Sequence, residues 1–256
     1  MSWDRGVVVK NEKELALMRE AGRVNALALA TVRELIRPGI STAELDAAAE
    51  NVIRKNGGIP IFKGYPGAYP YPATLTISLN EELVHGIPSK RKFREGDIVS
   101  IDCGTLLDGF VGDSAFTMGV GKISEEAEKL LEVTEQALYI GIEKMRKGNR
   151  TGDVSSAIQN FVESHGLFVT REYTGHGVGR NMHEGPQVPN YGTPGRGLEL
   201  RPGVTIALEP MVLIGTSQTR VKPDQWTVVS ADGSLTAHFE HTVAVTEGDP
   251  MILTLP

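Results

Sequence analysis

The stretch formed by residues 96–113 constrains the fold more than any other part of the chain. Apolar residues just before Asp102 predict a buried strand, yet the carboxylate follows where the strand should still be buried. An ionised carboxylate is costly there unless it is paired, hydrogen-bonded or bound to a metal. Asp108-Gly109 predicts a two-residue hairpin turn that places Gly104 opposite Asp113. Because side chains alternate along a strand, Asp102 and Asp113 then share one face and can approach one cation.

A second stretch repeats this pattern. Residues 203–209 match residues 96–102 position by position, with a glycine, a strand and then an acid, here Glu209. Asp232-Gly233 predicts another hairpin turn, and the strand expected after it ends in Glu240. The sequence thus offers a second pair of strand-borne acids.

The helices repeat in the same order as the strands. Asn11 and Glu14 predict a capping box for the first helix, and apolar spacing together with glycine turns predicts helices at 12–37, 41–56, 124–146 and 151–165. We therefore predict a single catalytic domain, 1–256, with an internal repeat of about 12–120 and 124–245. Its two similar halves should face each other, with their acids at the seam.

Composition narrows the class of protein. The 256 residues carry a net charge of -6, which argues against a nucleic-acid surface and so against DNA as a partner. A single cysteine, Cys103, excludes an internal disulfide, and Met1–Arg5 shows no apolar signal segment. No run reaches the roughly 18 apolar residues of a membrane span. We expect a cytoplasmic protein with no membrane partner.

Three loops supply further candidate groups. Glycines flank His176, which lets the backbone come close to whatever the imidazole binds, and His183 follows within reach of the same cleft. The segment is no dinucleotide loop, because Met182 stands where the last glycine of G-x-G-x-x-G belongs. His85 lies in a loop shortly before the acidic hairpin, and Tyr71 lies in a stretch rich in proline, glycine and tyrosine that could wall a pocket.

Together these patterns give a candidate ligand set of four carboxylates and one imidazole: Asp102, Asp113, His176, Glu209 and Glu240. Closed structural zinc sites are rich in cysteine and histidine, so these ligands do not fit a structural zinc site. Four carboxylates suit two divalent ions about 3.5–4 Å apart that hold a shared water for hydrolysis. Manganese, iron or cobalt fit such ligands at least as well as zinc. There is no Gly-x-Ser-x-Gly elbow, and Cys103 should point away from Asp102, which argues against a serine or cysteine nucleophile.

The chain resembles type I methionine aminopeptidases of the short bacterial form. The resemblance runs through nearly the whole chain and rests on Asn80-Glu81, His85-Gly86-Ile87-Pro88, Gly96 to Asp102, Gly109 to Asp113, Thr174 to Arg180, His183-Glu184, Gly203 to Met211 and Phe239 to Thr242. It implies the α/β (α+β) pita-bread fold: two pseudo-symmetric halves and a curved, mostly antiparallel sheet, with helices outside and the metal site at the seam. It also implies removal of the initiator methionine from nascent proteins whose second residue is small.

The resemblance implies a role for each candidate ligand. Asp102, Asp113 and Glu240 would hold one metal, and His176 and Glu209 the other, with Asp113 and Glu240 bridging. A metal-bridging water or hydroxide would attack the first peptide carbonyl, and Glu209 would accept its proton.

The resemblance also implies residues that handle the substrate. His183 would contact the scissile peptide, and His85 would assist the substrate amine or the leaving group. The methionine pocket maps onto Tyr71, Thr76, Met182 and Trp226.

Some positions depart from the family pattern. Family members often have cysteine at the positions of Thr76 and Val84, and phenylalanine at that of Met182, which affects the lining of the pocket but not the ligands. His238 stands where glutamine is expected; it either contacts the site from behind or faces solvent at the rim.

The sequence also allows two other interpretations. A proline-specific dipeptidase or X-Pro aminopeptidase of the same fold uses the same five ligands but usually carries a further N-terminal domain. A relative that has lost its metal could serve as a peptide-binding or ribosome-associated protein, although all five ligands are present here. For the main reading we expect the N-terminal peptide of nascent proteins as substrate, a possible contact with the ribosome, and a monomer.

Overall fold

The computed structural model describes residues 6–256. Met1–Arg5 lie outside the described residues. They form the start of the predicted domain 1–256, and the prediction that there is no signal segment concerns them. Within residues 6–256, no helix combines the length and the apolar character needed to cross a membrane.

The helices begin and end close to where the sequence predicts them. In the described part of the chain they are α1 Glu12–Leu35, α2 Thr42–Lys55, α3 Glu125–Lys144 and α4 Thr151–Ser164. The predicted capping box of α1 is present: the Asn11 side chain accepts the Glu14 backbone N–H at 3.0 Å, and the Glu14 carboxylate accepts the Asn11 N–H at 3.1 Å. These bonds satisfy backbone donors that a helix start would otherwise leave unpaired.

The strands of residues 6–256 form one large sheet and two small ones. Their bounds are β1 Ile59–Pro60, β2 Leu75–Leu79, β3 Glu82–Val84, β4 Ile98–Leu107, β5 Phe110–Gly119, β6 Phe168–Val169, β7 Thr174–Gly177, β8 Glu184–Pro189, β9 Thr205–Leu208, β10 Met211–Leu213, β11 Thr219–Val221, β12 Val228–Ser230, β13 Thr236–His238, β14 Glu240–Ala244 and β15 Met251–Ile252. The large sheet follows the order β1-β4-β5-β14-β9-β7-β8, with β2 also paired to β4 and β15 to β14. The small sheets are β13-β10-β6 and β11-β12-β3.

The first acidic hairpin has the predicted register. Gly104 on β4 faces Asp113 on β5, and Asp102 faces Ala115. Asp108 and Gly109 connect the strands with φ of 48° and 79°, the left-handed values that a tight two-residue hairpin turn requires. The position of both aspartates therefore follows from one turn and the period of a strand.

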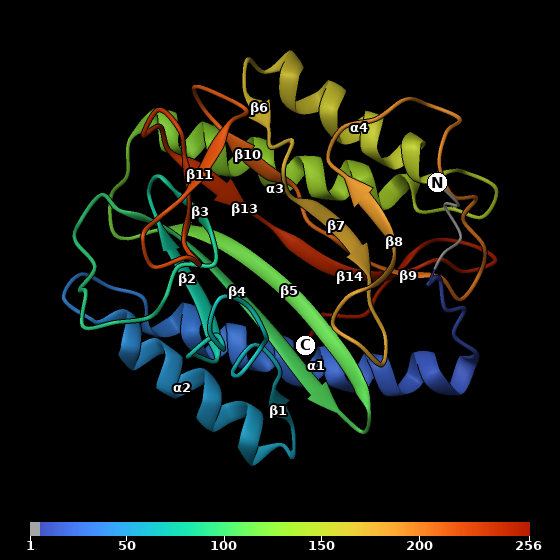
Figure 1. Cartoon of the computed structure of the whole chain (residues 1–256), viewed down its shortest axis with the longest axis horizontal. Coiled ribbons are helices and arrows are strands. Elements are labelled where there is room, and N and C mark those ends of the chain that lie inside the picture. Colours follow the sequence, from blue (N-terminus) through green and yellow to red (C-terminus); the bar gives the residue numbers. More distant parts are fainter. Residues whose placement is uncertain (1–5) are drawn as a thin grey trace.

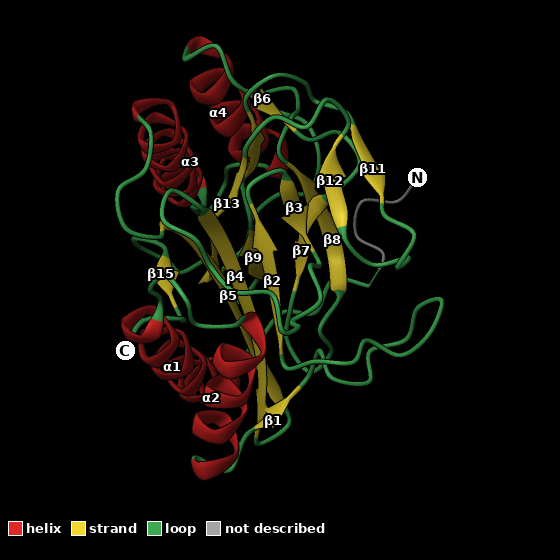
Figure 2. Cartoon of the chain, turned by 90° about the vertical axis from the view of Figure 1, so that its left-hand side faces the viewer, coloured by secondary structure: helices red, strands yellow, loops and turns green. Residues whose placement is uncertain are grey.

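Two similar halves meet in the middle of the large sheet. There β5 and β14 run antiparallel, with Glu240 opposite Ala115; β4 lies beyond β5, and β9 beyond β14. Helices α1 and α2 lie along one half and α3 and α4 along the other (Figure 1). Seen from the side, all four cover the same face of the sheet (Figure 2). The predicted pita-bread arrangement, with helices outside and two pseudo-symmetric halves, is confirmed.

The covered face of the sheet packs closely on the helices. A Cβ on Gly112 would lie 2.6 Å from the Gly22 Cα, so α1 approaches β5 more closely than side chains allow. On the same face, the Asn25 amide donates to the Ser114 hydroxyl at 2.8 Å. Because neighbouring side chains alternate, Asp113 points to the opposite face.

One predicted hairpin is wrong. Asp232-Gly233 forms a turn, but the strands on either side, β12 and β13, lie in different small sheets. The single strand expected over 235–240 is also split, because Phe239 leaves the ladder and donates its N–H to the Pro210 carbonyl at 3.3 Å. The chain passes at this residue from the small sheet of β13 into the large sheet, and Glu240 is its first residue there.

Candidate metal centre

The five predicted ligands come from five neighbouring strands of the large sheet. In the order of the sheet they lie on β4, β5 and β14, directly after β9, and on β7: Asp102, Asp113, Glu240, Glu209 and His176. Residues distant in the sequence are thus brought to one place because their strands are adjacent.

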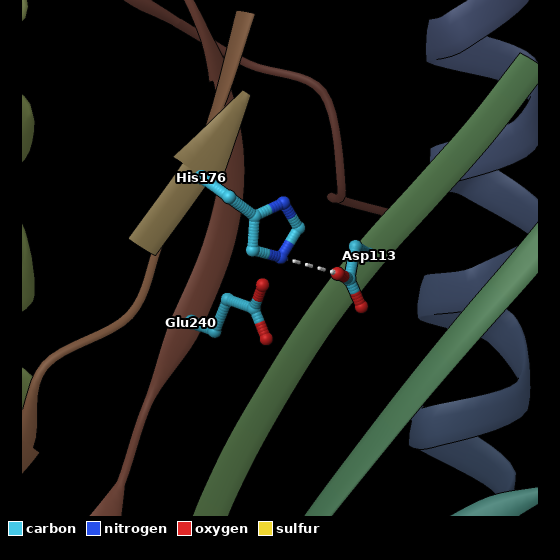
Figure 3. A group of neighbouring side chains, drawn as sticks. All are labelled: Asp113, His176 and Glu240. Carbon is cyan, nitrogen blue, oxygen red and sulfur yellow. Dashed lines mark ion pairs between the residues drawn. The ribbon is translucent and has the colours of Figure 1, made fainter. Parts of the chain in front are cut away.

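The side chains of these residues converge. The His176 Nε2 atom lies 3.7 Å from Asp113 Oδ2 and 3.6 Å from Glu209 Oε1. Ligand atoms of Asp113, His176 and Glu240 all lie within 4.8 Å of one another, and Figure 3 shows the three side chains pointing toward a common point. This spacing allows them to share one cation.

The surroundings of His176 leave one ring nitrogen free for a ligand. Its Nδ1 lies 2.9 Å from the Gly177 carbonyl oxygen and donates to it, which assigns the lone pair to Nε2. Burial, followed by the nearby His183, lowers the pKa of His176 to about 3, so the ring is neutral at physiological pH. A Cβ at Gly177 would collide with the Gly185 carbonyl, which explains the glycine beside this histidine.

Buried carboxylates in the cluster lack partners. Among the residues that the structure describes, Asp102 Oδ1, Asp113 Oδ1 and Glu240 Oε1 are buried without a hydrogen bond. Burial raises the pKa of all three well above the ordinary range, and neighbouring carboxylates raise it further. Buried polar groups normally find partners, so these oxygens fit a bound cation, and the oxygen-rich donor set with one imidazole suits a divalent metal.

The cluster forms the floor of a cavity of about 150 Å³. Every ligand and every substrate residue that the sequence predicted lines it; the complete lining is Phe62, Tyr65, Tyr71, Thr76, His85, Asp102, Asp113, His176, Met182, His183, Glu209, Trp226 and Glu240. The structure thus brings all predicted site residues together, while their individual roles stay predictions.

Two lining residues were missed by the sequence reasoning. Phe62 and Tyr65 belong to the same stretch rich in proline, glycine and tyrosine from which Tyr71 alone was kept. The Tyr65 hydroxyl lies 2.6 Å from His183 Nδ1. The clustering of aromatic residues was the available signal, but it does not say which rings turn inward.

The substrate candidates are held by local backbone features. His85 follows β3 with φ of 61°, and its ring lies 6.0 Å from that of Tyr173 and 6.4 Å from that of Trp226. Thr76 on β2 faces Asp102 on β4. The Tyr71 hydroxyl is buried within 3.0 Å of two backbone carbonyl oxygens, so this ring is fixed in the wall.

His238 lies behind the cluster and not at its rim. Its side chain is 2% exposed, and its Nε2 atom lies 3.5 Å from Glu209 Oε2 and 3.8 Å from Glu240 Oε2. The same nitrogen has no hydrogen-bond partner among the described residues. Of the two places that the sequence left open for this histidine, the structure supports contact with the site from behind.

Comparison with known proteins identifies the class that this fold and cluster define. The model of metallopeptidase family M24 matches residues 16–247, and the chain belongs to this family. Methionine aminopeptidase of Clostridium acetobutylicum is 50% identical over 250 residues, which are 97% of this chain and 99% of that protein. Within family M24, the chain is therefore a member of the methionine aminopeptidases, and the predicted class of metal-dependent hydrolase is confirmed.

Solved structures agree with this membership. The crystal structure of methionine aminopeptidase from Thermotoga maritima is similar with a TM-score of 0.95 and 46% identity, covering 98% of this chain and all of that one. Prolidase from Pyrococcus horikoshii is similar with a TM-score of 0.76 and 24% identity, covering 96% of this chain but 63% of that one. The second similarity concerns the fold alone.

Proposed function

We propose that this chain is a metal-dependent aminopeptidase that removes the N-terminal methionine from peptides and nascent proteins whose second residue is small. The observation that carries the proposal is the convergence of four carboxylates and one imidazole on the floor of a narrow cavity. The near full-length similarity to proteins named methionine aminopeptidase supports the choice of substrate.

The donor set supports two divalent ions in this cavity. Asp102, Asp113, His176, Glu209 and Glu240 would hold these ions. Manganese, iron and cobalt suit these ligands, and zinc is an alternative. Bound divalent ions supply a water of lowered pKa and polarise the substrate carbonyl.

The chain's own residues then move the protons and hold the peptide. Glu209 is the most accessible of the acids, with 13% of its side chain exposed, and it accepts the proton of the attacking water at a carboxylate oxygen. His183 lines the cavity beside His176 and donates to the scissile peptide. Burial lowers the pKa of His85 to about 4 and keeps it neutral, so it can accept a hydrogen bond from the substrate amine or assist the leaving group.

The other lining residues of the cavity receive the methionine side chain. Tyr71, Thr76, Met182 and Trp226 line the cavity together with Phe62. A pocket lined largely by aromatic rings suits an unbranched thioether, which also makes favourable sulfur–aromatic contacts. From the sequence we also predict a contact with the ribosome, a monomeric state and a cytoplasmic location.

The deciding experiment measures methionine release from a Met-Gly-Met peptide. Protein stripped with a chelator is assayed with manganese, cobalt, iron and zinc added back separately, and a Gly-Pro dipeptide serves as the control. Methionine release restored by metal, with the dipeptide intact, is the expected result. Cleavage of the dipeptide would move the chain to the proline-specific branch, and no cleavage of either peptide by folded, metal-loaded protein would indicate a binding protein.

A further inference from the structure

The backbone segment before α1 runs beside the start of β8, directly after the loop that carries His183. Residues 6–10, which we call the N-terminal strap, pass the start of β8, where Val7 forms a parallel bridge with Gly185 and the Gly185 N–H donates to the Gly6 carbonyl at 3.0 Å. The strap ends at Lys10, whose N–H donates to the Gly203 carbonyl at 2.8 Å. The strap therefore has a defined path against the second half of the chain (Figure 1).

A buried ion pair joins the strap to β8. Lys10 Nζ lies 2.6 Å from Glu184 Oε2, and the two side chains are 2% and 4% exposed. Lys10 Nζ also donates to the Val8 carbonyl at 3.0 Å. Taking two charges out of water is costly, and such a pair often adds little net stability. Glu184 directly follows the cavity residue His183 in the chain, so the pair can determine the position of the neighbouring loop.

The same carboxylate shapes the loop that supplies two residues to the cavity. This β7–β8 loop, residues 178–183, includes Met182 and His183. Glu184 Oε1 accepts the backbone N–H of Arg180 at 2.9 Å and that of Asn181 at 3.3 Å. Glu184 Oε2 thus binds the strap, while Glu184 Oε1 accepts the N–H groups of the turn just before Met182 and His183.

The loop is packed around this ion pair. A Cβ at Gly179 would lie 2.5 Å from Lys10 Cε and 2.7 Å from Glu184 Oε1. The loop backbone therefore lies directly on the two charged side chains. If either side chain moves, the loop backbone must move as well.

We propose that Lys10 and Glu184 are positioning residues: their ion pair holds the β7–β8 loop so that Met182 and His183 line the substrate cavity. The consequence for catalysis rests on the proposed function. The five metal ligands lie on or directly after strands of the large sheet and do not depend on this contact. Loss of Lys10 leaves the Glu184 carboxylate buried without its cation, so that side chain turns toward water and releases the two amides.

The test is Lys10→Met, with Lys13→Met as the matched control because Lys13 is exposed on the first turn of α1. Hydrogen exchange of the Arg180 and Asn181 amides should become about tenfold faster in the first variant. The kcat/KM for Met-Gly-Met should fall about tenfold, through a higher KM and a lower kcat, while the calorimetric metal affinity changes less than about twofold. Lys10→Arg, which keeps the charge, should restore most of the wild-type values.

Other outcomes would overturn the proposal. If Lys10→Met lowers the Tm but leaves the exchange of both amides and the kcat/KM unchanged, the pair only stabilises the fold. If Lys10→Met does not fold, the variant with both Lys10→Met and Glu184→Leu avoids a lone buried charge and removes the acceptor of the two amides, so it should show the same faster exchange. A wild type that released no methionine would count against the proposed function, whereas the exchange of the two amides would still decide the positioning role.

Discussion

The hydroxyl oxygen of Tyr65 lies 2.6 Å from Nδ1 of His183, and the two rings meet edge to face with centroids 5.4 Å apart. Burial raises the pKa of Tyr65, so the phenol keeps its proton at neutral pH. A hydroxyl that donates to Nδ1 leaves the imidazole proton on Nε2, where it can be given to a substrate. The tyrosine therefore selects the form of His183 that can act as a donor.

Replacement of Tyr65 by Phe should weaken catalysis without touching the metal. Without the hydroxyl, His183 has no fixed tautomer, and we expect kcat/KM for Met-Gly-Met to fall about tenfold. Metal affinity measured by calorimetry should equal that of the wild type. Tyr139→Phe, on the exposed side of α3, is the matched control. Unchanged kcat/KM in the Tyr65 variant would show that His183 needs no orienting partner.

Replacement of His176 by Ala should abolish methionine release and weaken metal binding. The loss of affinity should exceed the roughly 10–100-fold that partners of a ligand typically contribute. Circular dichroism should report an intact fold, because the side chain contacts the cluster and not the packing between sheet and helices. His165→Ala, at the end of α4, should behave as the wild type. Full activity in the His176 variant would exclude the proposed centre.

His238 offers a test of the departure from the family pattern. Its Nε2 lies 3.5 Å from a Glu209 oxygen and 3.8 Å from a Glu240 oxygen, so an N–H at this point stabilises the ionised carboxylates electrostatically. His238→Gln keeps a donor and should retain metal affinity, whereas His238→Leu should lower it about tenfold. Calorimetric titration with manganese measures both. Equal affinities in the two variants would mean that the histidine only fills space.

Metal binding should release protons at pH 7. In the metal-free protein, burial raises the pKa of Asp102, Asp113, Glu209 and Glu240 well above the ordinary range, and neighbouring carboxylates raise that of Asp102, Asp113 and Glu240 further. A cation favours the ionised forms, so on the order of one proton or more should leave with each binding event. Titrations in two buffers of different ionisation enthalpy measure the number. Asp108→Asn, in the hairpin turn, should release the same number, and equal heats in both buffers would contradict the prediction.

His241 should make the stability of the metal-free protein depend on pH. Burial lowers the pKa of His241 to about 4, below the ordinary histidine value of 6.5. Between these values the unfolded chain binds a proton that the native protein does not, so stability is lost as the pH falls. The raised pKa values of the acidic cluster change the stability with pH in the opposite direction. A His241→Gln variant has the same cluster, so this contribution cancels when the two proteins are compared. The wild type should therefore lose up to about 1.4 kcal/mol per pH unit relative to the variant.

Urea unfolding of both proteins between pH 7 and pH 4 gives this difference directly. Parallel stability curves for the wild type and the variant would show that His241 is protonated equally in the native and unfolded states.

The parts of the site that sequence could predict depend on local rules. Asp102 and Asp113 were placed correctly because an Asp-Gly turn fixes the register and side chains alternate with a period of two. Glu209 was found through the repeat of the same pattern. The positions of these side chains depend on residues that are close in the sequence, so a local pattern is enough to predict them.

Contacts between distant segments had no such signal. Lys10 precedes a helix cap and resembles a surface lysine, and only the folded chain shows its contact with Glu184. Tyr65 turns into the cavity because of the course of an irregular loop, which has no period. The predicted hairpin at Asp232-Gly233 failed because turn residues specify a turn but not which strands pair afterwards.

The placement of the ligands on β5 and β14 has a consequence for the lifetime of the folded state. These strands are neighbours in space, although one lies before α3 and the other near the end of the chain. If these predicted ligands hold a metal, they would join β5 and β14 across the intervening chain, much as a disulfide would. The two halves would then part only after the metal has dissociated, so loss of the metal would limit the rate at which the loaded protein unfolds.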